Sequence, residues 1–217
     1  MTSENKVQWV YASENNTQLE ERYDEWAKDY DEGMESDFGY VIPRVAAETF
    51  SEFVSKEARV LDAGAGTGLV GVELHRLGYT NIEAMDLSRG MLEEARRKGV
   101  YSGFHQMIMG ERLDFDTGSF DAAIGVGVFT LGHAPASSFD ELARVVRPGV
   151  FVAFTLRPDV YEQNGFREKQ RQLEYDGTWE LACATEEFQG MPKGEPDVFF
   201  QVWIYRVSPR VHSPDPT

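Results

Sequence analysis

Hydrophobic residues along the chain occur either at helical spacing or in short continuous runs. The first clear helix is predicted over residues 19–31, because four bulky residues recur at intervals of four, three and four: Leu19, Tyr23, Trp26 and Tyr30. Further helices are predicted over 40–54, 67–77, 88–98, 137–146 and 159–173. Strands are predicted over 59–62, 81–85, 104–109, 120–128, 150–156, 178–188 and 198–207. Helices and strands therefore alternate through most of the chain.

Alternation of this kind, with strands that are apolar throughout, predicts an α/β fold. Its sheet is mainly parallel, has about seven strands and is covered on both faces. The last two runs are joined by a Pro- and Gly-rich connection and predict a C-terminal antiparallel hairpin. We expect one domain over 1–217, with a polar segment at 1–18, a helical segment at 19–57, the α/β core at 58–207 and a proline-rich tail at 208–217.

Ligands of such sheets bind outside the carboxyl ends of the strands, where the strand order reverses. Four segments follow predicted strands and are the places to look for chemistry: 62–68, 86, 110–113 and 127–133. A single cysteine, Cys183, and the absence of histidine pairs at ligand spacing predict neither disulfides nor a metal site.

Composition and net charge limit the classes of partner that the chain can bind. The 217 residues are 41% hydrophobic, which is enough for a sizeable core. The formal net charge is −16, and ten acids and two bases fall between Glu14 and Asp37. This charge disfavours nucleic acid as a partner, because binding it requires Lys and Arg to replace phosphate counterions. The N-terminus has no signal-peptide pattern and no apolar run could span a bilayer, so we expect a cytoplasmic protein without membrane attachment.

A glycine-rich segment follows the strand at 59–62 and reads Asp62-Ala-Gly64-Ala-Gly66-Thr-Gly68. Glycines let the backbone turn sharply and approach a ligand closely. Two interpretations compete. The run from Gly66 to Gly71 matches the dinucleotide fingerprint G-x-G-x-x-G, with Asp86 twenty residues on, which would indicate NAD. An acid two residues before the first glycine instead suits a ligand that carries an ammonium and a sulfonium.

The fuller pattern resembles motif I of the class I S-adenosylmethionine-dependent methyltransferases. In that family an acid at the end of the second strand binds the ribose, and Asp86 in Ala84-Met-Asp-Leu-Ser88 matches it. The passage from Leu113 to Asp121 resembles the family's entry into its fourth strand, with Asp114 in place of the usual proline. Residues 126–133, Val-Gly-Val-Phe-Thr-Leu-Gly-His, suggest the methyltransferase group named for the Williams–Beuren deletion region.

The resemblance implies a Rossmann-like fold, an N-terminal helical lid over the cofactor, and S-adenosylmethionine as cofactor with S-adenosylhomocysteine as product. The cofactor-binding residues that it implies are Tyr23, Trp26, Tyr30, Asp62, Gly64, Ala65, Gly66, Gly68, Asp86, Leu87, Met91, Glu111, Arg112, Val126 and Gly127. Glu111 is the acid nearest to the position that binds the adenine amino group in the family, although it is displaced by one or two residues.

The activity implied is methyl transfer by in-line displacement to a small-molecule acceptor, or failing that to a protein side chain. The sulfonium carries its own activation, so the protein mainly positions the reactants. If a proton must leave, His133 and Tyr30 are the candidate catalytic residues. The helix predicted at 159–173 and the acidic connection near Glu186, Glu187 and Glu195 are expected to shape the acceptor pocket.

Two other functions remain open: a protein that binds S-adenosylmethionine without transferring methyl, and an NAD(P)-dependent oxidoreductase. The second lacks a recognisable Tyr-x-x-x-Lys motif or a further domain. We expect a monomer or a weak homodimer.

Overall fold

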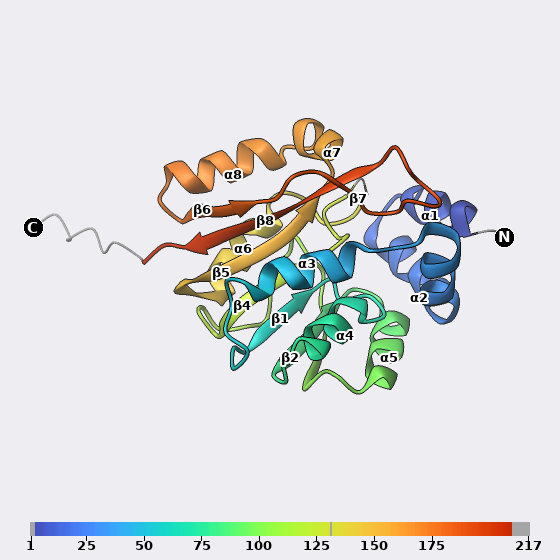
Figure 1. The fold of residues 1–217 in the computed structure, drawn as a ribbon, viewed down its shortest axis with the longest axis horizontal. Coiled ribbons are helices and arrows are strands. Elements are labelled where there is room, and N and C mark those ends of the chain that lie inside the picture. The colour runs from blue at the N-terminus through green and yellow to red at the C-terminus, as the bar shows by residue number, and fades with distance from the viewer. Residues whose placement is uncertain (1–2, 131, 210–217) are drawn as a thin grey trace, which may run out of the picture.

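The computed structural model describes residues 3–130 and 132–209 (Figure 1). Within these residues an eight-stranded sheet forms the centre of the molecule, in the order β3-β2-β1-β4-β5-β8-β6, with β7 paired to β8. The strands are β1 (Val60–Ala63), β2 (Ile82–Asp86), β3 (Gly103–Gln106), β4 (Phe120–Gly125), β5 (Val146–Leu156), β6 (Trp179–Ala184), β7 (Phe188–Gln189) and β8 (Phe199–Val207). The helices are α1 (Ser3–Tyr11), α2 (Asn16–Gly33), the π-helix η1 (Met34–Phe38), α3 (Ile42–Ser51), α4 (Leu69–Arg76), α5 (Arg89–Lys98), α6 (Ser138–Val145), α7 (Pro158–Gln163) and α8 (Phe166–Tyr175).

The first five strands are parallel to one another, and β8 runs antiparallel to both β5 and β6. The chain leaves β1 for β2 on one side and later returns to β4 on the other, so the strand order reverses between β1 and β4. The predicted Rossmann-like sheet, mainly parallel with an antiparallel C-terminal part, is confirmed. The short β7 adds one strand to the seven expected.

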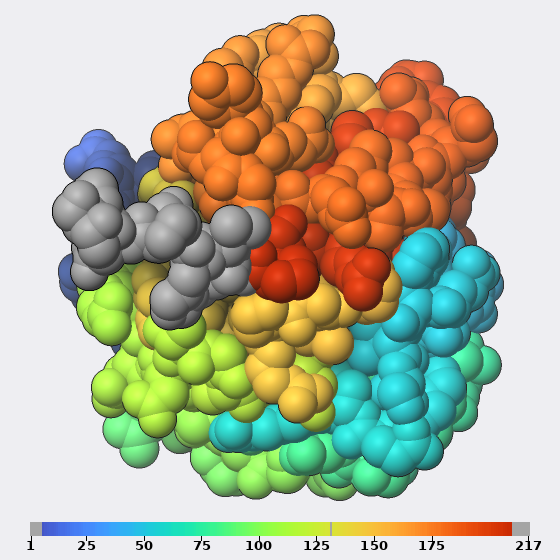
Figure 2. All heavy atoms as spheres, turned by 90° about the vertical axis from the view of Figure 1, so that its left-hand side faces the viewer, coloured from blue at the N-terminus to red at the C-terminus, as the bar shows by residue number. Residues whose placement is uncertain are grey.

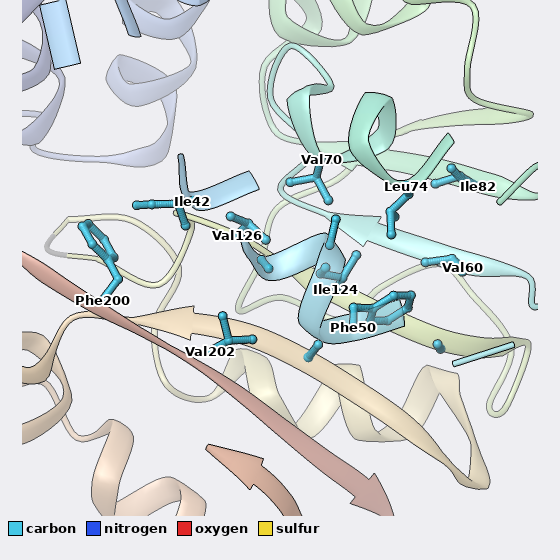
Figure 3. Close-up of a cluster of buried hydrophobic side chains, with 14 of the residues drawn as sticks. Ile42, Phe50, Val60, Val70, Leu74, Ile82, Ile124, Val126, Phe200 and Val202 are labelled. Atoms are coloured by element: carbon cyan, nitrogen blue, oxygen red, sulfur yellow. The ribbon is translucent and has the colours of Figure 1, made fainter. Parts of the chain in front are cut away.

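Two apolar clusters cover the two faces of the sheet. On one face, Phe50 of α3 and Leu74 of α4 pack over Val60 and Ile124, as Figure 3 shows. On the other, Phe139 of α6 and the helix α8 pack over Leu61 and Phe154. Successive residues of a strand point to opposite faces, which is why neighbours such as Val60 and Leu61 belong to different clusters. The strands are apolar throughout because both faces are covered.

The helices α1 and α2 lie beside the end of the sheet toward which β1 and β5 point (Figure 1). From the opposite end the surface is formed mainly by α8, the end of β8 and the loops that precede the parallel strands, with α1 and α2 largely hidden behind (Figure 2). The N-terminal helices therefore cover the edge of the sheet where the ligand-binding loops are expected.

The structure departs from the predicted elements at several places. Residues 3–11 form the helix α1 where we expected a polar segment, because Val7 and Val10, three positions apart, are buried in the core. The helix predicted over 159–173 is broken into α7 and α8 at Gly165, whose φ of +77° belongs to the left-handed region. From residue 210 onward the predicted tail lies outside the described residues. Among the described residues, no helix combines the length and the apolar character needed to cross a bilayer.

Candidate functional site

A cavity of about 610 Å³, open to solvent in part, lies at the carboxyl ends of β1 and β4 and is called the central cavity here. Its walls come from the glycine loop, the end of β2, the loop after β4 and the N-terminal helices. They comprise Tyr23, Tyr30, Tyr40, Pro43, Gly64, Ala65, Gly66, Thr67, Leu69, Val70, Asp86, Leu87, Met91, Val126, Gly127, Val128 and His133. The position is the point where the strand order reverses, as expected for a sheet of this topology.

The glycine loop, residues 64–68, has a backbone conformation that requires glycine. Gly64, Gly66 and Gly68 have φ values of +79°, +54° and +91°, a region that residues with a side chain rarely adopt. A Cβ at Gly64 would lie 2.6 Å from a methyl carbon of Val128, whereas one at Gly66 would meet no atom within 4 Å. The backbone at Gly66 therefore borders open space, which allows a ligand to approach it closely.

Asp86 ends β2 and lines the central cavity. Its Oδ2 accepts from the N–H of Gly66 at 2.8 Å and its Oδ1 from the N–H of Ser88 at 2.9 Å. Burial raises the pKa of Asp86 to about 6, although these backbone hydrogen bonds act in the opposite direction. The two bonds fix the carboxylate, and each oxygen retains a lone pair for a ligand hydroxyl.

Asp62 is the penultimate residue of β1 and does not line the central cavity. The hydroxyl of Tyr101 donates to its Oδ2 at 2.6 Å, and its Oδ1 has no hydrogen-bond partner among the described residues. Burial raises the pKa of Asp62 to about 7, and the hydrogen bond from Tyr101 lowers it in part. The two acids that we expected to face one ligand thus differ in position: Asp86 is at the cavity wall and Asp62 is one layer behind the glycine loop.

Tyr101, which the sequence analysis did not identify, fills the space behind this loop. Its hydroxyl also accepts from the N–H of Gly71 at 3.1 Å. A Cβ at Gly71 would lie 2.2 Å from the ring and one at Gly68 would lie 2.8 Å from it. Gly68 therefore contacts Tyr101 rather than the cavity. The spacing of these two glycines was the available signal that a bulky side chain packs against them.

Two carboxylates of α2 attach this helix to the loops below it. Asp24 accepts from the hydroxyl of Ser88 at 2.5 Å and from the N–H of Gly90 at 2.7 Å, both at the beginning of α5. Asp31 accepts from the hydroxyl of Thr67 at 2.5 Å and forms an ion pair with Lys98 at 2.5 Å. Part of the acidity of the segment 14–37 thus serves to hold α2 over the cavity.

An outer cavity of about 390 Å³ extends from the central one and shares Gly64, Asp86, Leu87, Val128 and His133 with it. Its other walls are mostly apolar: Asn16, Leu19, Met107, Ile108, Met109 and Ala134. Glu111 and Arg112, which we expected near a bound base, are exposed and line neither of these cavities. The three residues 107–109 follow the end of β3 at Gln106, which is three residues before the predicted end of this strand.

An inner cavity of about 510 Å³ lies on the other side and shares Tyr23, Tyr30, Tyr40 and Gly127 with the central cavity. The rest of its wall is Val7, Val10, Tyr11, Trp26, Met34, Ile42, Thr130, Met191 and Phe200. Trp26, predicted to contact the cofactor, lines this cavity and not the central one. The described residues of α7 and α8 do not line this cavity. The connection between the last strands contributes Met191, and its acids Glu186, Glu187 and Glu195 do not line the cavity.

His133 lies where the central and outer cavities meet. Its Nε2 and the hydroxyl of Tyr23 are 2.7 Å apart, and its Nδ1 and the hydroxyl of Thr130 are 3.0 Å apart. Burial raises the pKa of Tyr23 and of Tyr30 well above the usual value of 10. These tyrosines therefore keep their protons at neutral pH and act as hydrogen-bond donors, which disfavours Tyr30 as a base.

Of the residues predicted from sequence, eleven line the central cavity: Tyr23, Tyr30, Gly64, Ala65, Gly66, Asp86, Leu87, Met91, Val126, Gly127 and His133. Five do not: Trp26, Asp62, Gly68, Glu111 and Arg112. Six others line it without having been predicted: Tyr40, Pro43, Thr67, Leu69, Val70 and Val128. Within the described part of the chain, no group of three or more His, Cys, Asp or Glu side chains could hold a metal ion.

Comparison with known proteins gives a consistent result. The model of a family described as "Methyltransferase domain" matches residues 60–149. The human protein Methyltransferase-like protein 27 is 33% identical over 165 residues, which are 73% of this chain and 66% of the human protein. The chain thus matches just under two thirds of the length of that relative.

Solved structures share the fold at low sequence identity. The cyclase SpnF has a TM-score of 0.70 at 16% identity, covering 89% of this chain and 96% of its own. A TehB-like SAM-dependent methyltransferase from Corynebacterium glutamicum has a TM-score of 0.62 at 15% identity, covering 87% and 99%. At these identities the likeness concerns the fold alone.

Proposed function

Because the chain belongs to the class I S-adenosylmethionine-dependent methyltransferases, we propose that it transfers a methyl group from S-adenosylmethionine to a small-molecule acceptor. One observation carries the proposal. Three connected cavities meet at the reversal of strand order, with a glycine loop and a fixed carboxylate in the middle one and apolar walls on either side. A cofactor and a separate acceptor each have a place to bind.

The residues present fit S-adenosylmethionine. Asp86 would accept hydrogen bonds from the ribose hydroxyls with the lone pairs that its backbone donors leave free. Leu87 and the segment 107–109 give the outer cavity apolar walls suited to an adenine ring. The open backbone at Gly66 would hold the amino-acid end, and the unpartnered Oδ1 of the buried Asp62 lies behind the same loop.

The bound cofactor would supply an activated methyl group on a sulfonium. The chain itself orients the two reactants and excludes water. Asp24 and Asp31 hold α2 over the central cavity, so the cavity is roofed by Tyr23 and Tyr30. Orientation of this kind supplies roughly 7–11 kcal/mol of barrier reduction in well-placed systems.

An acceptor that loses a proton needs a base, and we propose His133 for this role. Its Nε2 can take a proton through the hydroxyl of Tyr23, which lines the central and inner cavities. We expect His133→Asn to lower turnover by about a hundredfold, as is typical for the loss of a general base, and to leave cofactor affinity within twofold. Equal losses in turnover and affinity would assign His133 to binding alone.

The direct test of the proposed function is calorimetric titration of the protein with S-adenosylmethionine, S-adenosylhomocysteine and NAD. We expect saturable binding of both adenosyl ligands and none of NAD. Saturable NAD binding without the adenosyl ligands would overturn the proposal.

Turnover is then screened with a labelled methyl donor against amines, thiols, phenols and carboxylates. Methyl transfer to at least one class supports the proposal. Tight cofactor binding with no transfer to any class would instead support a protein that binds S-adenosylmethionine without catalysis.

A further inference from the structure

Two tyrosine hydroxyls that have no hydrogen-bond partner among the described residues lie between the central and inner cavities. Tyr30 and Tyr40 line both cavities, and no described residue forms a hydrogen bond with either hydroxyl, whereas the hydroxyl of Tyr23 pairs with His133. Burial raises the pKa of Tyr30 and of Tyr40 above the usual value of 10. Both are therefore neutral O–H donors that need an acceptor atom.

No described residue that lines the inner cavity carries a charge. Asp31 is paired with Lys98 and Thr67. Arg157 is paired with Asp159 through two hydrogen bonds of 3.0 and 2.8 Å, and it also interacts with the hydroxyl of the wall residue Tyr11. An ammonium bound here would be desolvated without a counter-charge in the wall, which is strongly unfavourable. The charge of Arg157, which a carboxylate would need, is already balanced by Asp159. The cavity is therefore suited to a neutral molecule.

The shape and walls of the cavity indicate an aromatic occupant. The space between its walls, about 510 Å³ with the part open to solvent included, limits the size of the occupant. Trp26 lies parallel to Tyr23 at a ring distance of 6.4 Å and edge-on to Tyr30 at 4.8 Å, so the wall presents several aromatic surfaces. One or two fused rings would pack against such a wall.

From these three observations we propose that the acceptor is an uncharged aromatic hydroxyl compound of one or two rings, and that the Tyr30 and Tyr40 hydroxyls bind its oxygen. This inference rests on the proposed methyl transfer. The hydroxyl oxygen would then lie at the boundary of the two cavities, next to Gly127, where a Cβ would be 2.8 Å from the Tyr40 oxygen.

The reaction balances with groups that the chain provides. The acceptor oxygen forms a bond to the methyl carbon while the carbon–sulfur bond breaks and its electron pair remains on sulfur. The hydroxyl proton passes to the oxygen of Tyr23 as the proton of Tyr23 moves to Nε2 of His133. Tyr30 and Tyr40 donate to the acceptor oxygen and stabilise the negative charge that grows on it.

The test measures binding of four naphthalene probes to the protein loaded with S-adenosylhomocysteine: 2-naphthol, naphthalene, 2-naphthoate and 2-naphthylmethylammonium. All four probes contain the same pair of rings, so differences in their affinities arise from the attached group. We expect 2-naphthol to bind at least tenfold more tightly than the ammonium and the carboxylate, and severalfold more tightly than naphthalene.

Single-residue variants test whether the Tyr40 hydroxyl binds the oxygen of the probe. Tyr40→Phe keeps the ring and is expected to weaken 2-naphthol binding about three- to tenfold, the range for one neutral hydrogen bond, while naphthalene binding stays unchanged. Tyr79→Phe is the matched control, because Tyr79 is a buried tyrosine whose hydroxyl donates to the carbonyl of Val54, away from these cavities. It should leave the affinity for both probes unchanged.

The outcomes are separable. If S-adenosylhomocysteine itself does not bind, the proposed function fails. If it binds and the ammonium or the carboxylate probe binds as tightly as 2-naphthol, or if Tyr40→Phe weakens naphthalene as much as 2-naphthol, only the acceptor class is overturned. Methylation of 2-naphthol by the wild-type protein, reduced in Tyr40→Phe and not in Tyr79→Phe, would support both.

Discussion

The two halves of the site are built in opposite ways. The central and outer cavities have two buried carboxylates at or behind their walls, and most of their lining comes from loops that directly follow strands. The inner cavity has no charged lining among the described residues and is assembled from positions between Val7 and Phe200. The first half places a buried carboxylate among loops that directly follow strands, and the second is an apolar space between residues that are far apart in the sequence.

This difference has a thermodynamic consequence. Buried carboxylates lower the stability of the folded protein when they are ionised, whereas apolar walls do not respond to pH. The pH dependence of stability should therefore originate in the half that contains Asp62 and Asp86, while the choice of acceptor should originate in the other half. The following predictions separate the two halves, from the largest expected effect to the smallest.

Asp62 should give the largest effect, on the stability of the ligand-free protein. Its folded pKa of about 7 lies above its unfolded value near 4. Its contribution is therefore most favourable below pH 4 and is lost as the pH rises through 7. Asp62→Asn should raise the free energy of unfolding at pH 8 by on the order of 2–4 kcal/mol, and by progressively less toward pH 4, as measured by urea denaturation.

Asp114→Asn is the control for this measurement, since Asp114 is exposed and should change stability by less than about 0.5 kcal/mol at any pH. A gain for Asp62→Asn that does not vary with pH would mean that the pKa of Asp62 is the same in the folded and in the unfolded protein, which would contradict the raised folded pKa.

Asp86 should give the largest effect on cofactor affinity. Asp86→Ala removes the carboxylate that we assign to the ribose and should weaken binding of S-adenosylhomocysteine by roughly 1–3 kcal/mol, the cost of a lost charge-assisted hydrogen bond. Calorimetry measures the affinity, and circular dichroism confirms the fold. Unchanged affinity in a folded variant would refute the ribose role.

The attachment of α2 should have an intermediate effect. Asp24→Ala removes the acceptor for Ser88 and Gly90 at the beginning of α5. The attachment of α2 to α5 should become less stable by about 1 kcal/mol. In stopped-flow experiments, S-adenosylhomocysteine should dissociate about three- to tenfold faster. Glu25→Ala, an exposed neighbour on the same helix, should dissociate at the wild-type rate; equal acceleration in both variants would indicate a general effect of charge.

Glu111 and Arg112 should give the smallest effect. Both were predicted from the sequence to lie near the cofactor, and both are exposed. Glu111→Ala and Arg112→Ala should each change the affinity for S-adenosylhomocysteine by less than about 0.5 kcal/mol, as for ordinary surface positions. A loss above tenfold would mean that the loop at 110–113 closes onto the ligand when it binds.

The same contrast explains what the sequence could predict. The parallel sheet, the glycine loop and Asp86 follow from strand-sized apolar runs and the residues that end them, so local patterns are enough. The orientation of Asp62 depends on Tyr101, which lies 39 positions away and belongs to no motif. The short α1 was missed because two buried valines in a polar segment give a weak signal.

The inner cavity could not be predicted at all. Tyr40 lies just before α3 and Ile42 begins it, whereas Met191 lies between β7 and β8 and Phe200 lies in β8. In the sequence each of these reads as an ordinary core residue, and only tertiary packing leaves a space between them. The expectation that 159–173 would shape an acceptor pocket assumed one continuous helix, and the break at Gly165 separates α7 from α8.

The central claim is that the cavity at the ends of β1 and β4 binds the methyl donor. A crystal structure of the protein with S-adenosylhomocysteine tests it most directly. We predict ribose hydroxyls within hydrogen-bond distance of Asp86, the amino-acid end over residues 64–68, and the base beside residues 107–109. A ligand bound elsewhere, or a central cavity that stays closed to it at saturating concentration, would contradict the account.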